Sequence, residues 1–310
     1  MTKVDNRKNL TQWKLPIYVY SDLNKALKSG FNRDGIYQIR INEHASLDIL
    51  VKNSELFSKC ETLIVGFGGA IMNRGKKKGP FFSGLSITDD IEAPCLLISD
   101  PTLDLSQKIS LSWYAGSETN PHLRPFIVDL LNGISQLYQV RIVLFGGSGA
   151  GFAILSLINS LVAGSLAFVW NPQTSISRYF PNFVHRYLEV AFPNSLAQLR
   201  PGESESEATN SAAYEKALEE TGIVHNLLKE NYDACHNTIF FLQNRHDWHL
   251  DQHANPYLTR IGQWTRLAPA VFVNEAKTAA MVIGDWGAGH AVPPRELIHS
   301  LLGLCATIIY

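Results

Sequence analysis

Short runs of β-branched and other apolar residues recur along the chain, with polar or mixed segments between them. The later runs are uninterrupted rather than alternating, which is the pattern of parallel strands buried on both faces. This succession predicts an α/β fold with a doubly wound, mostly parallel sheet. The predicted strands are residues 17–20, 36–41, 62–66, 95–99, 141–145, 166–170, 238–243 and 279–284.

Three further segments have helical patterns. Residues 121–138 carry apolar side chains at a spacing close to 3.6, after Asn120 and Pro121, which are typical of a helix start. Residues 150–161 are almost wholly apolar, which predicts a helix buried in the middle of the fold. Residues 294–304 are predicted to form the closing helix.

Residues 175–235 separate two predicted strands by far more than a usual connection. We expect a helical cap insertion here, with residues 1–174 and 236–310 forming the core. Ligands of open α/β sheets bind beyond the carboxyl ends of the strands, so the cap is expected to cover a pocket there. Its expected lining is an aromatic stripe that also fits the core of the cap itself: Tyr179, Phe180, Phe183 and Tyr187.

Composition narrows the class of protein. With 310 residues, 45% hydrophobic and 18% charged, the chain has enough apolar surface for a large core. The net charge is −1 and the longest basic block is 76–78, so we expect neither a nucleic-acid nor a membrane partner. No apolar run follows the N-terminal charges, and a cytoplasmic location is expected.

The four cysteines are widely scattered, without a CxxC pair. This spacing fits neither a zinc site nor a dense set of disulfides. We therefore expect buried free thiols at Cys60, Cys95, Cys235 and Cys305.

Residues 143–155 read VLFGGSGAGFAIL, in which a strand, a glycine-rich corner and a helix follow one another around Ser148. A nucleophile elbow needs small residues on both sides of its nucleophile, because strand and helix approach closely there. The sequence meets this requirement, although Ala150 stands where the last glycine of G-x-S-x-G is expected. A small-residue corner without chemistry is the alternative.

Two phosphate-binding motifs fail on the same residues. A dinucleotide fingerprint would need a small residue where Phe152 or Ile154 stands. A Walker loop would need a lysine followed by serine or threonine, and the stretch has neither. No cofactor is expected.

The segments after two later strands carry the other residues that a serine hydrolase needs. NRHDWHLDQH follows residues 238–243, and DWGAGHAVPP follows 279–284, which gives the chain order serine, acid, histidine. His290 is the predicted general base and Asp247 the predicted acid. Asp251 and Asp285 remain alternatives for the acid.

An oxyanion hole needs backbone N–H groups close to the reacting carbonyl. Gly149, directly after the serine, is the predicted first donor. The second is expected from the glycine-rich stretch GFGGAIMN that follows residues 62–66, at Phe67, Gly68 or Gly69.

With Ser148, Asp247, His290 and the GFGGA stretch in this order, the chain resembles the α/β-hydrolase superfamily from about residue 36 to its end. The stretches GFGGA, SWYAG, FGGSGAGFA and WNPQTSISRY also resemble, more loosely, bacterial hydrolase-fold proteins associated with capsule or glycan processing. The resemblance implies a serine hydrolase with these three residues as its triad.

The expected substrate is a carboxylic ester, such as an O-acyl group on a carbohydrate. Aromatic and amide side chains suit a polyol, and the stretch WNPQTSISRY places four of them after a strand: Trp170, Asn171, Gln173 and Tyr179. In the alternative interpretation Trp170 packs in the core, and Asn171 with the following proline only turns the chain.

Three rival interpretations remain open. His249 and His253, with Asp247 or His246, have the spacing of a metal site, but no HExxH motif is present and we expect no metal. The same triad would also serve an acyltransferase that uses an alcohol in place of water. A hydrolase-fold binding or scaffold protein would keep the elbow for structural reasons alone.

Overall fold

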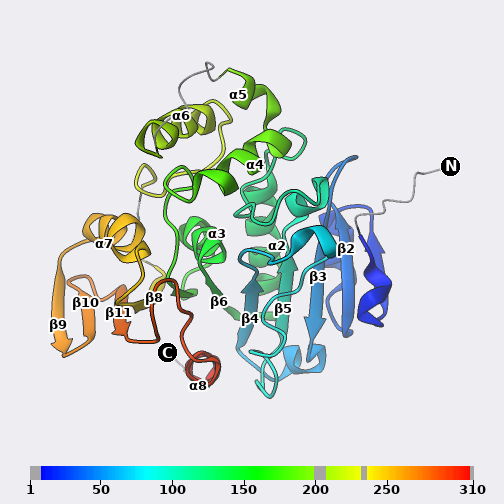
Figure 1. Cartoon of the computed structure of the whole chain (residues 1–310). Helices are drawn as coiled ribbons and strands as arrows, with labels where there is room; N and C mark the ends of the chain where they lie inside the picture. The colour runs from blue at the N-terminus through cyan, green and yellow to red at the C-terminus, as the bar shows by residue number, and fades with distance from the viewer. Residues whose placement is uncertain (1–7, 199–206, 232–235, 308–310) are drawn as a thin grey trace.

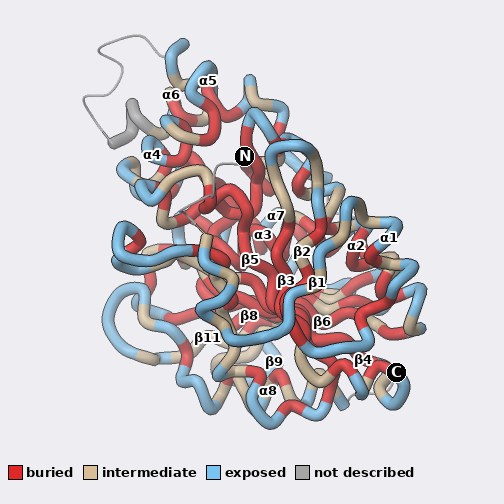
Figure 2. Tube along the Cα trace, turned by 90° about the vertical axis from the view of Figure 1, so that its right-hand side faces the viewer, coloured by how far each residue is buried: buried red, intermediate tan, exposed pale blue. Residues whose placement is uncertain are grey.

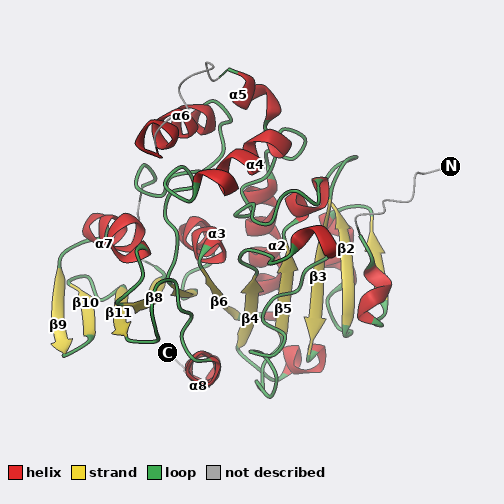
Figure 3. Ribbon diagram, in the orientation of Figure 1, coloured by secondary structure: helices red, strands yellow, loops and turns green. Residues whose placement is uncertain are grey.

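The computed structural model describes residues 8–198, 207–231 and 236–307. In this part of the chain, eleven strands form one sheet in the order β1-β2-β3-β5-β4-β6-β7-β8-β11-β10-β9. All neighbouring strands run parallel except where β3 and β10 reverse the direction. The architecture is therefore a large, mostly parallel α/β sheet, as the sequence predicts (Figure 3).

The strands are β1 Ile17–Tyr20, β2 Gly35–Arg40, β3 Ser46–Lys52, β4 Thr62–Phe67, β5 Cys95–Ser99, β6 Arg141–Gly147, β7 Leu166–Trp170, β8 Thr238–Asn244, β9 Trp264–Ala268, β10 Val271–Asn274 and β11 Ala279–Gly284. The helices are α1 Leu23–Ser29, α2 Leu123–Tyr138, α3 Gly149–Leu157, α4 Pro181–Ala191, α5 Pro193–Ala197, α6 Glu207–Glu219, α7 Asn255–Arg260 and α8 Arg295–Thr307.

Helices cover both faces of the sheet, which makes it doubly wound. On one face α1, α2, α3 and α7 share a core with the strands, and on the other α8 packs through Ile298 and Leu302. Every residue of β4 and β5 is buried, as expected of central parallel strands (Figure 2). This rigid centre holds the carboxyl ends of β4, β6, β7, β8 and β11 at one edge.

Three strands were not predicted from the apolar runs. β3 contains the buried Asp48 in its middle, which interrupts its apolar pattern. β9 is largely exposed and β10 is only half-buried, so neither carries a strong hydrophobic signal. Their pairing with distant segments of chain, rather than their local sequence, makes them strands.

The three predicted helices exist with shifted ends. α2 begins at Leu123 rather than near Pro121, because Ser117 and Asn120 form a bridged turn before it. α3 ends at Leu157, and a short 3-10 turn over Ile158–Ser160 completes the predicted span.

The two stretches of chain that connect the predicted cap to the core lie next to each other. Ile176 N donates to His225 O and Leu227 N donates to Thr174 O, both at 2.9 Å, so its ends lie side by side. α4, α5 and α6 lie beyond the carboxyl ends of the central strands (Figure 1). Residues 199–206 and 232–235 of the predicted cap lie outside the described residues, and its division from the core stays a prediction.

The cysteines that the structure describes are free thiols: Cys60, Cys95 and Cys305. Cys95 is buried, and burial raises the pKa of its thiol to about 12, whereas the other two are only half-buried, unlike the prediction. Cys235 lies outside the described residues. None of the described helices combines the length and the apolar character that crossing a bilayer requires.

Candidate active site

Ser148 stands at the turn between β6 and α3, with the backbone angles φ 56° and ψ −122°. A non-glycine residue with positive φ is strained, and strain of this kind is typical of nucleophile elbows. The turn is held by Ser148 N, which donates to Trp170 O at 3.0 Å, and by Gln173 N, which donates to Ser148 O at 3.1 Å. The serine side chain is thereby presented at the carboxyl edge of the sheet.

The glycines around Ser148 are required by close packing. A Cβ atom on Gly147 would lie 1.9 Å from Trp170 Nε1, and one on Gly151 would lie 2.6 Å from Pro172 Cβ. Neither neighbour is a flexible chain end, so larger residues at these positions would push β7 away from the elbow.

Ala150, which departs from the expected motif, is accommodated by the glycine across the turn. A Cβ atom on Gly146 would lie 2.8 Å from Ala150 Cβ, closer than two such atoms approach in proteins. Because Gly146 has no side chain, the single methyl group of Ala150 fits in a fully buried position.

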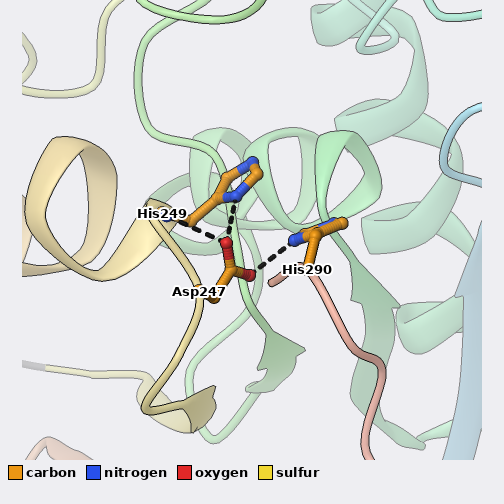
Figure 4. Close-up of side chains that lie close together, drawn as sticks. All are labelled: Asp247, His249 and His290. Carbon is orange, nitrogen blue, oxygen red and sulfur yellow. Dashed lines mark hydrogen bonds and ion pairs between the residues drawn. The ribbon is translucent and has the colours of Figure 1, made fainter. Parts of the chain in front are cut away.

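The structure brings Asp247 and His290 together from the loops after β8 and β11. Asp247 Oδ2 lies 2.5 Å from His290 Nδ1 (Figure 4). The two alternative acids are engaged elsewhere and are exposed. Asp251 accepts from Asn255 Nδ2, and Asp285 pairs with His246 at 3.3 Å.

Two asparagines at the ends of neighbouring strands hold the His290 loop. Asn244 Nδ2 donates to the carbonyl oxygens of Gly287 and Gly289, at 2.9 and 2.8 Å. Asn171 Nδ2 donates to Ala291 O at 2.9 Å, and its Oδ1 accepts from Asn244 N. The loop carrying the histidine is thus tied to β7 and β8 on both sides of His290.

Asp247 is buried and yet favours its charged form. Burial alone would raise its pKa, but hydrogen bonds from His249 and His290 outweigh burial and hold the pKa of Asp247 well below its usual range. A charged carboxylate accepts from the Nδ1–H of His290, which leaves Nε2 as the basic atom of that ring.

Ser148 and His290 line one cavity of about 420 Å³. In the structure the serine hydroxyl accepts a hydrogen bond from Gln173 Nε2 at 3.0 Å, and none joins it to His290. The cavity wall is mainly apolar and comprises Phe67, Gly69, Ala70, Met72, Ser83, Gly84, Ile87, Phe145, Gly147, Trp170, Tyr179, Phe183 and Val292.

The backbone N–H groups near the cavity differ in their availability. Gly68 N already donates to Tyr114 Oη at 2.8 Å. Gly69 lies beyond the end of β4 and lines the cavity, and in the part of the chain that the structure describes its N–H has no hydrogen-bond partner. Gly149 is the first residue of α3, so its N–H has no carbonyl partner within the helix. Phe67, the last residue of β4, also lines the cavity.

The four predicted substrate ligands fall into two groups. Trp170 and Tyr179 line the cavity. Asn171 and Gln173 are fully buried, and their amides are engaged: Asn171 with the His290 loop, Gln173 with Ser148 and with Trp113 Nε1. Substrate binding by these two residues stays a prediction.

The predicted aromatic stripe divides in the same way. Tyr179 and Phe183 line the cavity, whereas Phe180 is half-exposed and contacts Tyr179 edge to face and Trp248 in a tilted arrangement. Tyr187 is fully buried and donates to Gly116 O at 2.9 Å, so it belongs to the packed interior.

Of the residues considered for a metal site, His249 lies against Asp247, whereas His246 and His253 have hydrogen-bond or ion-pair partners elsewhere. His246 pairs with Asp285, and His253 Nδ1 accepts from Thr174 N. Asp247, His249 and His290 do place ligand atoms within 4.8 Å of one another and have the residue types to hold a metal. In the structure, however, these atoms are already engaged in hydrogen bonds with each other.

No protein-family model and no curated protein matches the sequence. Solved structures do match. A capsule O-acetyltransferase of Neisseria meningitidis serogroup A is similar with a TM-score of 0.56 at 15% identity, over 91% of this chain and 98% of that one. An arylesterase gives 0.51 at 12% identity, over 89% and 84% of the chains. An esterase of Pyrobaculum calidifontis gives 0.50 at 11% identity, over 92% and 87%.

The likeness to these neighbours is that of a large, mostly parallel sheet covered by helices, and at this level of identity it concerns the fold alone. Together with the strand order and the turn at Ser148, it establishes that this chain has the α/β-hydrolase fold.

Proposed function

We propose that this protein is a serine hydrolase that cleaves a carboxylic ester through an acyl-enzyme. The observation that carries the proposal is the hydrogen bond between Asp247 and His290 at the cavity into which the strained turn presents Ser148. A scaffold protein would gain nothing from a buried charged carboxylate aimed at a histidine beside that serine.

In the proposed reaction His290 Nε2 takes the proton of Ser148 Oγ as the oxygen attacks the ester carbonyl. The hydroxyl first leaves its hydrogen bond with Gln173. The N–H groups of Gly149 and Gly69 stabilise the negative charge on the carbonyl oxygen, each contributing about 3 kcal/mol. His290 then gives its proton to the leaving alcohol, and water repeats the sequence on the acyl-enzyme.

For the substrate we propose an O-acyl group on a carbohydrate. The apolar wall of the cavity suits the acyl part. The rings of Trp170 and Tyr179 at the cavity supply flat surfaces on which a sugar can stack. Transfer of the acyl group to an alcohol instead of water is the second candidate, and the capsule O-acetyltransferase with the same fold motivates it. The cytoplasmic location expected from the sequence stays a prediction.

A fluorophosphonate probe tests the nucleophile, because only an activated serine reacts with it. We expect labelling of Ser148 in the wild type and none in Ser148→Ala. Labelling of another serine would assign the nucleophile to that residue, and no labelling at all would favour the scaffold interpretation.

Substrate class is tested with p-nitrophenyl acetate, butyrate and laurate, followed by acetylated sugars, on the wild type and Ser148→Ala. We expect hydrolysis of short-chain esters and acetylated sugars that depends on Ser148. A Ser148-dependent preference for laurate would overturn the carbohydrate proposal. Labelling by the probe without turnover of any ester would favour the transferase.

A further inference from the structure

Asp247 holds a second histidine besides His290. Its Oδ1 accepts from the backbone N of His249 at 2.9 Å and from the ring Nδ1 of His249 at 2.7 Å (Figure 4). Its Oδ2 is the oxygen paired with His290. The Asp247 side chain has 0% exposure, so two imidazole rings and one backbone N–H take the place of water around this carboxylate.

The contacts of His249 fix its charge and its tautomer. Its Nδ1 faces a carboxylate oxygen and therefore carries the proton. Its Nε2 is buried without a hydrogen-bond partner, so a second proton there would be an unpaired buried charge. Burial, with His290 nearby, lowers the pKa of His249, in agreement with a neutral ring that donates to Asp247.

The two histidines also touch through their faces. The His249 and His290 rings have centroids 4.2 Å apart and an interplanar angle of 28°. The His249 ring also contacts the rings of Trp248 and His253, with centroid distances of 4.1 and 5.1 Å. His290 is thus held at Nδ1 by Asp247 and along one face by a buried ring.

We propose that His249 is a positioning residue for the acyl-transfer reaction, acting through the hydrogen bond that its Nδ1–H donates to Asp247. This inference rests on the proposed function. The donor fixes the second carboxylate oxygen, which sets the direction of the first oxygen toward His290. Without it, the buried Oδ1 keeps only the backbone N–H of His249, and the orientation of the carboxylate is less tightly fixed.

A matched pair of variants separates the hydrogen bond from packing. His249→Asn keeps an N–H donor near the position of Nδ1 but loses most of the ring. His249→Phe keeps a ring of similar size but has no donor. A residue that only fills space would tolerate Phe better than Asn, whereas a positioning donor requires the opposite order.

We expect His249→Phe to lower kcat, and the rate of fluorophosphonate labelling, by about 10-fold to 100-fold with little change in KM, since partners that orient a reacting side chain have effects of this size. His249→Asn should stay within about threefold of the wild type. Folding of each variant is checked by circular dichroism and thermal unfolding.

The pH profile gives a readout that packing alone would not move. Loss of the His249 donor leaves more negative charge facing His290, so the acidic limb of kcat/KM should move to higher pH in His249→Phe and not in His249→Asn. The titratable groups that face His249 are Asp247, His253, Tyr179 and His290, and Arg178 is a further charge that acts on His253.

Three results would overturn the inference while the proposed function stands, with Ser148 labelled in the wild type. The first is that His249→Phe has the same kcat as the wild type. The second is that His249→Asn has a lower kcat than His249→Phe. The third is that EDTA abolishes activity and zinc restores it. If His249→Phe does not fold, His249→Gln replaces it, because its longer amide cannot donate from the Nδ1 position and must be slow where Asn is fast. Absence of Ser148 labelling in the wild type would instead overturn the proposed function and this inference together.

Discussion

Asp247 and Asp104 lie in two separate clusters among the described residues, and burial has opposite consequences for their carboxylates. Asp247 receives hydrogen bonds on both oxygens from histidines, and its pKa stays well below the usual range. Asp104 lies with Lys8 and Asp48 beside the N-terminal half of the sheet, where burial raises its pKa to about 6 although Lys8 Nζ is 2.9 Å away.

The difference comes from the number and geometry of the donors. Lys8 Nζ must serve Asp48 at 2.6 Å as well as Asp104, and neither oxygen of Asp104 has a well-formed hydrogen bond. Asp247 instead has three N–H groups directed at it. A buried charge is stable where hydrogen bonds replace its water, and nearby opposite charge alone is a poorer substitute. The hydrogen-bonded carboxylate of Asp247 therefore suits a reaction centre, whereas the ion pairs of Lys8 with Asp48 and Asp104 suit a structural role.

The largest expected effect is on kcat, which should fall when Asp247 is substituted and stay unchanged when Asp104 is substituted. Asp247→Asn should lower kcat by about 10⁴, because an amide no longer holds His290 in the tautomer that accepts the serine proton. Asp104→Asn is the matched control and should keep full kcat. Steady-state kinetics on an ester substrate measure both. Equal losses in the two variants would mean that the clusters act on activity through stability alone.

The second largest effect is expected from removing Lys8, the cation that Asp48 and Asp104 share. Lys8→Met should lower the free energy of unfolding by about 3 kcal/mol, because it removes the cation that pairs with both buried carboxylates and leaves only Arg74 acting on Asp104. Denaturant titration near neutral pH measures the change, while fluorophosphonate labelling of the folded variant should be unaffected. A change below about 1 kcal/mol would show that Lys8 behaves as an ordinary surface ion pair.

A smaller effect concerns pH. Asp104 binds its proton more tightly in the folded chain than at its ordinary pKa of 3.8, so its contribution to stability is fully present below about pH 4 and is lost as the pH rises through 6. The wild type should therefore gain about 2 kcal/mol relative to Asp104→Asn between about pH 7 and pH 4.

Asp247 has the opposite sign. Its lowered pKa means that its contribution is present above about pH 4 and is lost as the pH falls further, so the deficit of Asp247→Asn should shrink only in that acid range. Unfolding curves at several pH values test both slopes. Parallel slopes for the two variants would contradict the contrast between the clusters.

The smallest effect is expected at the exposed acids near the site. Asp251→Asn and Asp285→Asn should each change kcat by less than about twofold and the free energy of unfolding by less than about 0.5 kcal/mol, since exposed pairs contribute little. Kinetics and thermal unfolding check this. A loss like that of Asp247→Asn in either variant would transfer the role of the acid.

The sequence predicted the central part of the fold because that part has strong local signals. Eight of the strands are predicted from their runs of apolar residues, and among them the half-exposed β1 lies at the edge of the sheet, whereas the central ones are buried. β3, β9 and β10 escaped because a buried aspartate or solvent exposure interrupts their apolar pattern, and only pairing across the sheet reveals them.

The candidate site divides in a similar way. Ser148 is predicted from the steric demand of its turn, and Asp247 and His290 are predicted from their places after strands. The hydrogen bond between His249 and Asp247 is not predicted, because a histidine two residues after an aspartate in a loop has no distinctive spacing. Asn244, which ties the His290 loop, and Tyr114, which engages the Gly68 N–H, act through contacts between segments far apart in sequence, and such contacts leave no local pattern.

The packing of Ala150 against Gly146 changes what the elbow motif means for comparing sequences. The turn has room for one methyl group, and in this chain that room belongs to position 150. The two positions therefore share a joint volume limit, and substitutions at one are conditional on the other. A search pattern that scores each position separately would penalise this chain for a departure that its partner residue already compensates.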